Sequence, residues 1–261
     1  MNNSEKDRQE SFPWDRSAFF NEYNSILGYY QVQSCLEHAH GESLLDLPCG
    51  DGTLTGMFAR HFKRVVGVDA SSKHLEVARK RLPGVEFHEC LIEDFKPVEL
   101  FDTVVMLNIL EHVTDPVSVL RHVGTLLKPR GVLIVHVPNA YAINRRLAVL
   151  MGTLESCEEI SPFDIQVVGH RRSYSMKTLR KDIEQSGLHI SHTGGVFYKM
   201  LSTPQIDWFL KNGLWEEGGF GWGRVGADKR DWKAEFCRAS YELGKERPED
   251  CNIIYVCATL H

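Results

Sequence analysis

From residue 43 onward, short apolar runs alternate with longer segments of helical periodicity, and this alternation restricts the fold more than any other feature of the chain. The apolar runs predict strands at residues 43–47, 64–69, 85–90, 103–107 and 132–137. The segments between them predict helices near residues 53–61, 72–81 and 115–127. The sequence Lys-Pro-Arg-Gly ends the last of these helices. Because nearly continuous apolar strands require cover on both faces, the sequence predicts a doubly wound, Rossmann-like α/β fold.

The rest of the chain extends this core at both ends. Residues 1–11 are polar and predict a disordered tail, whereas residues 12–40 carry aromatic side chains at helical spacing and predict N-terminal cap helices. After a helix near 176–186, apolar runs at 188–190 and 252–260 predict two late strands, with an antiparallel strand at the sheet edge. The tryptophan-rich stretch near 200–250 is too long for a turn and predicts a helical insertion.

We therefore expect a seven-stranded, mostly parallel sheet in a single domain spanning residues 12–261. Within it, the boundaries are a cofactor-binding core at 41–195, an insertion at 196–250 and a last strand at 251–261. The insertion has three open uses, which are to line a substrate pocket, to cover the sheet edge or to form a homodimer interface.

Composition excludes several classes of function. The formal net charge of −5 argues against a nucleic-acid partner, which usually requires a basic face. No apolar run approaches the roughly 18 residues of a membrane span, and we expect no membrane-spanning helix. The seven cysteines include no Cys-x-x-Cys pair and are typical of free thiols in a reducing compartment. These features predict a cytoplasmic protein.

The segment LLDLPCGDGT at residues 44–53 joins a buried strand to a helix through a glycine turn. Glycine lets a ligand approach the backbone closely, and a helix N-terminus presents amide groups to it. Asp69 ends the next strand, where its carboxylate can accept hydrogen bonds from both hydroxyls of a ribose. Together these features predict a nucleoside ligand. A nicotinamide dinucleotide is the weaker choice, because Asp46 would repel a pyrophosphate and attract an amino-acid ammonium group.

These segments resemble the motifs of class I S-adenosylmethionine-dependent methyltransferases, in the small-molecule subgroup that includes ubiquinone-biosynthesis O-methyltransferases. Residues 44–53 resemble motif I, and VVGVDAS at 65–71 resembles motif II. FDTVVMLNILEHV at 101–113 resembles motif IV with the turn after it, and LKPRGVLIV at 127–135 resembles the next helix-to-strand turn. The resemblance covers about residues 40–195 and implies both the fold and S-adenosyl-L-methionine as cofactor.

The resemblance also implies which residues contact the cofactor. Asp46 and the backbone around Pro48 and Gly50 are expected at its methionine end, and Asp69 at its ribose. The other implied contacts are Ala70, Leu91, Ile92 and Glu93 around the adenine, and Leu107 and Asn108 near the methionine portion. Two positions depart from the family pattern, since Pro48 replaces the usual first glycine and Leu91 replaces an acid for which Glu93 or Asp94 would substitute.

Methyl transfer from a sulfonium requires alignment of the nucleophile and removal of its proton. His112 follows the fourth strand, at the sheet edge where ligands bind in open α/β folds, and is the first candidate base. His170 is the second. We expect no metal, since the sequence has neither a His-x-x-x-His pattern nor clustered acids. The candidate acceptor contacts are Asn139, Tyr141, Arg171, Arg172 and Tyr174.

The acceptor is expected to be a hydroxyl of a small polar metabolite. The arginines favour a sugar, a sugar nucleotide or a phosphorylated or carboxylated molecule, because a guanidinium fork matches either anionic group. A quinone or phenol precursor and a small amine remain as alternatives. From another class, a non-catalytic S-adenosylmethionine-binding regulator also remains open.

Overall fold

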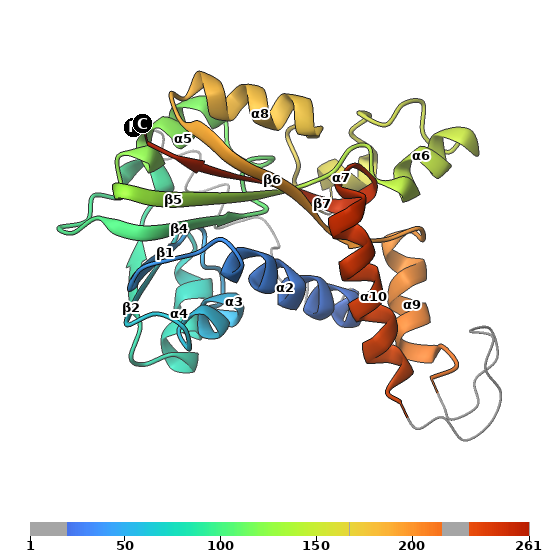
Figure 1. Cartoon of the computed structure of the whole chain (residues 1–261), viewed down its shortest axis with the longest axis horizontal. Helices are drawn as coiled ribbons and strands as arrows, with labels where there is room; N and C mark the ends of the chain where they lie inside the picture. Colours follow the sequence, from blue (N-terminus) through green and yellow to red (C-terminus); the bar gives the residue numbers. More distant parts are fainter. Residues whose placement is uncertain (1–19, 167, 216–229, 261) are drawn as a thin grey trace.

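The computed structural model of the chain describes residues 20–166, 168–215 and 230–260, and its centre is a seven-stranded sheet with helices against both faces (Figure 1). The strands are β1 (Ser43–Asp46), β2 (Arg64–Asp69), β3 (Glu86–Glu89), β4 (Phe101–Leu107), β5 (Leu127–Pro138), β6 (His189–Tyr198) and β7 (Cys251–Thr259). Their order across the sheet is β3-β2-β1-β4-β5-β7-β6. Neighbouring strands among β1–β5 pair in parallel, whereas β7 runs antiparallel to both β5 and β6. This confirms the predicted doubly wound, mostly parallel sheet with antiparallel pairing toward one edge.

The described part of the chain contains nine helices, and six of them pack against the sheet in two groups. They are α2 (Asn21–Leu36), α3 (Thr53–Phe58), α4 (Ser72–Arg81), α5 (Pro116–Gly124), α6 (Ile143–Leu150), α7 (Pro162–Gln166), α8 (Met176–Gln185), α9 (Thr203–Asn212) and α10 (Trp232–Glu246), with short 3-10 turns η1 (Ile92–Asp94) and η2 (Pro248–Asp250). Residues of α2, α3, α9 and α10 share one buried apolar cluster with the sheet. Residues of α5 and α8 share the cluster on the opposite face. Figure 1 shows α2 and α10 extending well beyond the sheet.

Two strands are longer than the apolar pattern predicts. β6 runs to Tyr198, although the apolar run ends at residue 190, because pairing with β7 recruits the polar and glycine residues that follow. β5 begins at Leu127, where its amino end pairs with Phe101 of β4. The insertion contains α9 and α10, which agrees with the predicted helical insertion. The predicted tail at 1–11, the start of the cap helices and Trp222 lie outside the described residues.

None of the helices in the described part of the chain has the length and apolar character that a membrane span needs. All seven cysteines carry free thiols, and five of them are buried.

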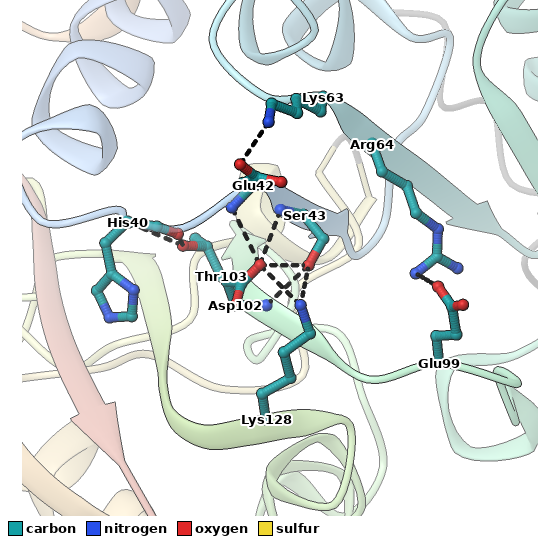
Figure 2. Close-up of polar contacts among 9 residues, drawn as sticks. All are labelled: His40, Glu42, Ser43, Lys63, Arg64, Glu99, Asp102, Thr103 and Lys128. Carbon is teal, nitrogen blue, oxygen red and sulfur yellow. Dashed lines mark hydrogen bonds and ion pairs between the residues drawn. The ribbon is translucent and has the colours of Figure 1, made fainter.

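Asp102 ties together the amino ends of three strands, at the opposite edge of the sheet from their carboxyl ends (Figure 2). Its Oδ2 accepts hydrogen bonds from Ser43 Oγ (2.7 Å), from the amides of Glu42 and Ser43 (3.0 Å each) and from Lys128 Nζ (2.9 Å). Desolvation opposes ionisation of this carboxyl, but the hydrogen bonds from Ser43 and Lys128 outweigh it and hold the pKa of Asp102 well below its usual range. The cluster therefore stabilises the ionised form of Asp102.

Replacing Asp102 by asparagine is expected to lower the free energy of unfolding at pH 7 by about 1–3 kcal/mol, the scale of hydrogen bonds to a charged group. Because the folded pKa lies below the unfolded value of about 3.9, this contribution is complete above pH 4–5 and disappears as the pH falls toward the folded pKa. Urea unfolding of both proteins between pH 7 and pH 3 measures it. The difference in free energy of unfolding between the parent and the variant should become smaller as the pH falls.

The matched control is Glu99→Gln, which removes an exposed ion pair with Arg64 (3.3 Å) in the same region. Exposed pairs contribute little, and the control should change the free energy of unfolding by less than about 1 kcal/mol. An Asp102→Asn effect that stays constant from pH 7 to pH 3 would contradict the assignment.

Candidate active site

Asp46 closes β1 with a buried carboxyl group that points toward the start of α3. Its side chain is 2% exposed, and Oδ2 accepts a hydrogen bond from Thr55 Oγ1 (2.7 Å). Burial raises the pKa of Asp46 to about 7; the Thr55 hydrogen bond acts against this rise, and the nearby Asp69 carboxylate adds to it. A buried carboxyl of this kind favours a cationic partner. Burial disfavours the ionised carboxylate, and an ammonium group beside it stabilises that ionised form.

The glycine turn after β1 bends back against the end of β2. Gly50 and Gly52 both have positive φ (52° and 78°), which only glycine adopts at little cost. The Gly50 amide donates a 2.9 Å hydrogen bond to Asp69 Oδ2, and the Ser71 amide donates a 2.8 Å bond to Asp69 Oδ1. Asp69, 8% exposed, is thereby held at the mouth of the turn. Pro48 lies half-buried in the same turn.

The segment after β3 lies beside the end of β2. The Cys90 amide donates to the carbonyl of Asp69 (3.2 Å), which joins the two strand ends. Leu91 and Ala70 are half-buried, Ile92 is buried and Glu93 is exposed. The structure therefore brings the residues implied for the ribose and the adenine to adjacent strand ends.

The end of β4 meets α2 through a pair of amide side chains. Asn108 has a positive φ of 55°, and its Nδ2 donates to Gln31 Oε1 (3.2 Å) while Gln31 Nε2 donates to Asn108 Oδ1 (3.4 Å). Gln31 is 2% exposed and also contacts His136 Nδ1 (3.4 Å). The sequence analysis missed Gln31, because a single glutamine on a helix gives no signal until the helix is placed over the strand end.

His112, Glu111 and His170 form a compact cluster beyond the end of β4. His112 is 5% exposed, and its Nδ1 lies 3.1 Å from the carbonyl oxygen of Gly169. Since a carbonyl only accepts, Nδ1 carries a hydrogen, and in the neutral form of the ring the lone pair is therefore on Nε2. Nε2 lies 3.7 Å from Oε1 of Glu111, which is 2% exposed. The His112 and His170 rings meet edge to face, with centroids 5.0 Å apart.

Backbone contacts hold this cluster together across a long stretch of sequence. The Arg171 amide donates to the carbonyl of Glu111 (2.8 Å), and the His170 amide donates to the carbonyl of Asp164 (2.8 Å). The two candidate bases therefore belong to one site. Glu111 completes it with a buried carboxyl group, 2% exposed.

The candidate acceptor-binding residues fall into two groups, those whose side chains hydrogen-bond within the protein and those that are exposed or half-buried. Tyr174, 2% exposed, donates its hydroxyl to Asp182 (2.9 Å), and Asn139 Nδ2 donates to the carbonyls of Glu249 and Cys251 (2.9 Å each). Arg172 donates to the carbonyls of Leu110, Val113 and Thr114. These three side chains bind the protein itself, and we infer that they shape the loops. Tyr141 is 44% exposed and reaches Glu158 (3.2 Å), whereas Arg171 is half-buried.

Lys199 is a buried lysine for which the sequence gave no signal. It directly follows the carboxyl end of β6, which runs in the same direction as β1–β5 and so ends at the same edge. The side chain is 3% exposed, and Nζ donates to Thr203 Oγ1 (2.9 Å) and lies over the Tyr23 ring (4.8 Å). Burial, and then the nearby Arg145 charge, lower the pKa of Lys199 to about 7. Among the described residues no carboxylate pairs with it.

Comparisons with known proteins agree with the fold. A family model described as a methyltransferase domain matches residues 45–133. The ubiquinone biosynthesis O-methyltransferase of Actinobacillus pleuropneumoniae serotype 5b (strain L20) is 30% identical over 178 residues, covering 61% of this chain and 74% of that protein. The trans-aconitate 2-methyltransferase of Enterobacter sp. (strain 638) is 30% identical over 180 residues, covering 66% and 67%.

A solved structure shows the same fold over nearly the whole chain. The S-adenosylmethionine-dependent methyltransferase from Clostridium acetobutylicum ATCC 824 superposes with a TM-score of 0.53 at 15% identity, covering 90% of this chain and 91% of that one.

Proposed function

This chain belongs to the class I S-adenosylmethionine-dependent methyltransferases, and we propose that it methylates a hydroxyl group of a small polar metabolite. S-adenosyl-L-methionine is its methyl donor. The observation that carries the proposal for a hydroxyl is His112, whose Nδ1 faces the Gly169 carbonyl so that the neutral ring presents its basic nitrogen at Nε2. A hydroxyl acceptor needs such a base, because an alcohol or phenol must lose its proton during transfer.

We propose that the cofactor lies along the carboxyl ends of β1, β2 and β4, where open α/β sheets bind ligands. The buried Asp46 carboxyl and the backbone at Pro48 and Gly50 would hold the ammonium and carboxylate of the methionine portion. The Asp69 carboxylate would accept hydrogen bonds from the ribose hydroxyls. The remaining contacts in this proposal are Ala70, Leu91, Ile92 and Glu93 around the adenine, and Leu107 and Asn108 near the sulfonium.

The transfer itself is an in-line displacement at the methyl carbon. The acceptor oxygen forms the new C–O bond as the C–S bond breaks, and the bonding electrons pass to sulfur to give S-adenosylhomocysteine. Because the sulfonium is already an activated donor, the chain must align the acceptor and handle its proton. We propose that the cluster of Glu111, His112 and His170 performs this second task, with His112 Nε2 as the base.

The environment of Lys199 supports an anionic acceptor. A buried ammonium group is costly unless an anion pairs with it, and Arg145 adds a second positive charge nearby. Of the two relatives described above, one is named for trans-aconitate and the other for ubiquinone biosynthesis. We propose a carboxylated or phosphorylated hydroxyl compound as the acceptor class, with a phenolic precursor as the alternative. The free thiols of all seven cysteines support a reducing compartment such as the cytoplasm.

The test is a direct search for product. The purified chain of 261 residues is incubated with S-adenosylmethionine and separate panels of hydroxy acids, sugar phosphates, catechols and amines. The release of S-adenosylhomocysteine and the mass of the product are measured. Turnover with hydroxylated anions and a gain of one methyl group on oxygen support the proposal. Cofactor binding with no turnover across all four panels would favour the non-catalytic regulator, and turnover confined to amines would overturn O-methylation.

Lys199→Met is expected to raise KM for an anionic hydroxyl acceptor at least about tenfold, since the variant removes a charge that pairs with the acceptor. In the parent, KM for that acceptor should rise above about pH 7, because the lysine loses its proton through its lowered pKa. Steady-state kinetics from pH 6 to pH 9 measure both effects. The control is Lys177→Met on the outer face of α8. Equal KM changes in the two variants would remove Lys199 from the acceptor site.

A further inference from the structure

We propose that Gln31, on α2, is a positioning residue that fixes the end of β4 for binding the methionine portion of the cofactor. It acts through Asn108, the residue that directly follows β4. The inference rests on the proposed function, because that function places Leu107 and Asn108 near the sulfonium. It adds a residue of an N-terminal helix to a cofactor site that is otherwise built from the ends of the strands.

Asn108 lies at a bend whose backbone conformation needs support from its surroundings. Its φ of 55° falls in the left-handed region, which is disfavoured for residues with a side chain, although asparagine adopts it more readily than most. The Asn108 amide donates to the carbonyl of His136 on β5 (2.9 Å). The course of the chain beyond β4 therefore depends on the contacts that hold Asn108.

Gln31 pairs with the Asn108 side chain through both of its polar atoms. Gln31 Oε1 accepts a hydrogen bond from Asn108 Nδ2 (3.2 Å), and Gln31 Nε2 donates one to Asn108 Oδ1 (3.4 Å). Two such bonds fix the distance between the two amide groups and also their relative orientation. Because Gln31 is only 2% exposed, water cannot easily replace these bonds. The pair therefore holds Asn108, and with it the bend, against α2.

A buried histidine fixes the direction in which the Gln31 amide points. Gln31 Nε2 also lies 3.4 Å from Nδ1 of His136, and an amide nitrogen only donates. His136 Nδ1 is therefore the acceptor, and the ring hydrogen is on Nε2, which faces Ser34 Oγ (3.5 Å). Burial, and then the nearby His38, lower the pKa of His136 to about 3, so the ring stays neutral. Only one orientation of the Gln31 amide satisfies both Asn108 and His136.

Other contacts already hold α2 in place, so its packing does not require a polar side chain at position 31. Tyr23, Leu27 and Val32 belong to the apolar cluster that joins α2 to the sheet. The Tyr23 amide also donates to Asp207 on α9 (3.0 Å). A methionine or leucine in place of Gln31 would occupy a similar volume without a polar group that has to be paired. The buried amide thus indicates a role in the geometry of the strand end.

The expected benefit is preorganisation of the cofactor site. A strand end that is fixed before the cofactor arrives does not have to be ordered during binding, and affinity is higher because that cost is avoided. If Gln31 acts in this way, its loss should weaken cofactor binding only while the Asn108 side chain is present. A residue that merely packs α2 against the sheet would show no such dependence.

The test is a double-mutant cycle on the binding of S-adenosylmethionine, measured by calorimetry with the chain of 261 residues. Gln31→Met removes both hydrogen bonds to Asn108 and should raise Kd at least about fivefold. Asn108→Gly removes the partner amide, and glycine keeps the positive φ at little cost. In the Asn108→Gly background, Gln31→Met should change Kd by less than about twofold, because its route of action is gone.

The matched control is Val32→Ala, which shortens a fully buried neighbour on the same helix and leaves the amide pair intact. It should lower Tm but change Kd by less than about twofold. Circular dichroism identifies any variant that does not fold, and Gln31→Leu takes the place of Gln31→Met in that case.

Three results would overturn the inference while leaving the proposed function standing. They are an unchanged Kd in Gln31→Met, a loss of affinity that persists in full in the Asn108→Gly background, and an equal loss of affinity in Val32→Ala. Absence of cofactor binding by the folded parent would instead reject the proposed cofactor site, and this inference with it.

Discussion

Replacing Asp69 by alanine is expected to weaken the binding of S-adenosylmethionine by about 1–3 kcal/mol, which is roughly a 5- to 150-fold rise in Kd. The reason is geometric. Each carboxylate offers about four lone-pair sites, and the amides of Gly50 and Ser71 occupy two of those on Asp69. His74 Nδ1 also lies 3.6 Å from Oδ1. The remaining acceptor capacity of the carboxylate is proposed for the ribose hydroxyls, and alanine removes it. Calorimetric titration with S-adenosylmethionine and S-adenosylhomocysteine measures the loss.

The control for this prediction is Asp51→Ala. Asp51 lies in the same turn and also accepts a backbone bond, from Thr53 (3.0 Å), but its carboxylate faces Arg81 (2.8 Å) on α4. Its removal should change cofactor affinity less than about threefold, on the scale of an exposed ion pair. Thermal melts of both variants separate lost binding from lost folding. Equal affinity losses in two folded variants would show that Asp69 acts only through the turn.

Leu45→Ala is expected to lower the free energy of unfolding by about 2–5 kcal/mol, the range for deleting a fully buried leucine. Leu45 is 0% exposed and lies in the middle of the sheet, where it pairs with Val66 on one side and Val104 on the other. The cavity left by the side chain cannot collapse easily, because strands on both sides fix its walls. Urea unfolding monitored by circular dichroism measures the effect.

Leu150→Ala is the matched control, since it makes the same substitution on α6 at a side chain that is 85% exposed. Exposed substitutions of this kind usually change stability by less than about 0.5 kcal/mol. If the two variants lost equal stability, β1 would not be the centre of the cooperative core.

Local sequence patterns predicted the boundaries of those strands and helices whose burial is similar along their whole length. β2 at Arg64–Asp69 and α4 at Ser72–Arg81 have the boundaries that the sequence predicted. A strand covered on both faces must be apolar throughout, and the basic last turn of α4 marks the end of that helix. β6 was predicted too short, because the polar and glycine residues 191–195 interrupt the apolar pattern before its buried end.

The residues proposed to hold the cofactor were predictable from the sequence for a related reason. Asp46, Gly50 and Asp69 lie within one strand-turn-helix-strand unit, and the turn itself brings them together. Residues that contact one another only after the sheet has assembled gave no such signal. The acceptor side depends almost entirely on contacts of that second kind.

The sequence by itself indicated the fold class, because hydrophobic periodicity marks the strands and helices, and it indicated the cofactor, because residues 44–53, 65–71 and 101–113 resemble methyltransferase motifs. Only the tertiary structure decided that Glu111 and His112 meet His170, that Gln31 faces Asn108, and that Lys199 is buried at the same edge. It also gave Tyr174 and Arg172 contacts inside the protein. The physical reason is that these contacts are set by how the long connections after β5 and β6 pack over the strand ends, and no local pattern encodes that packing.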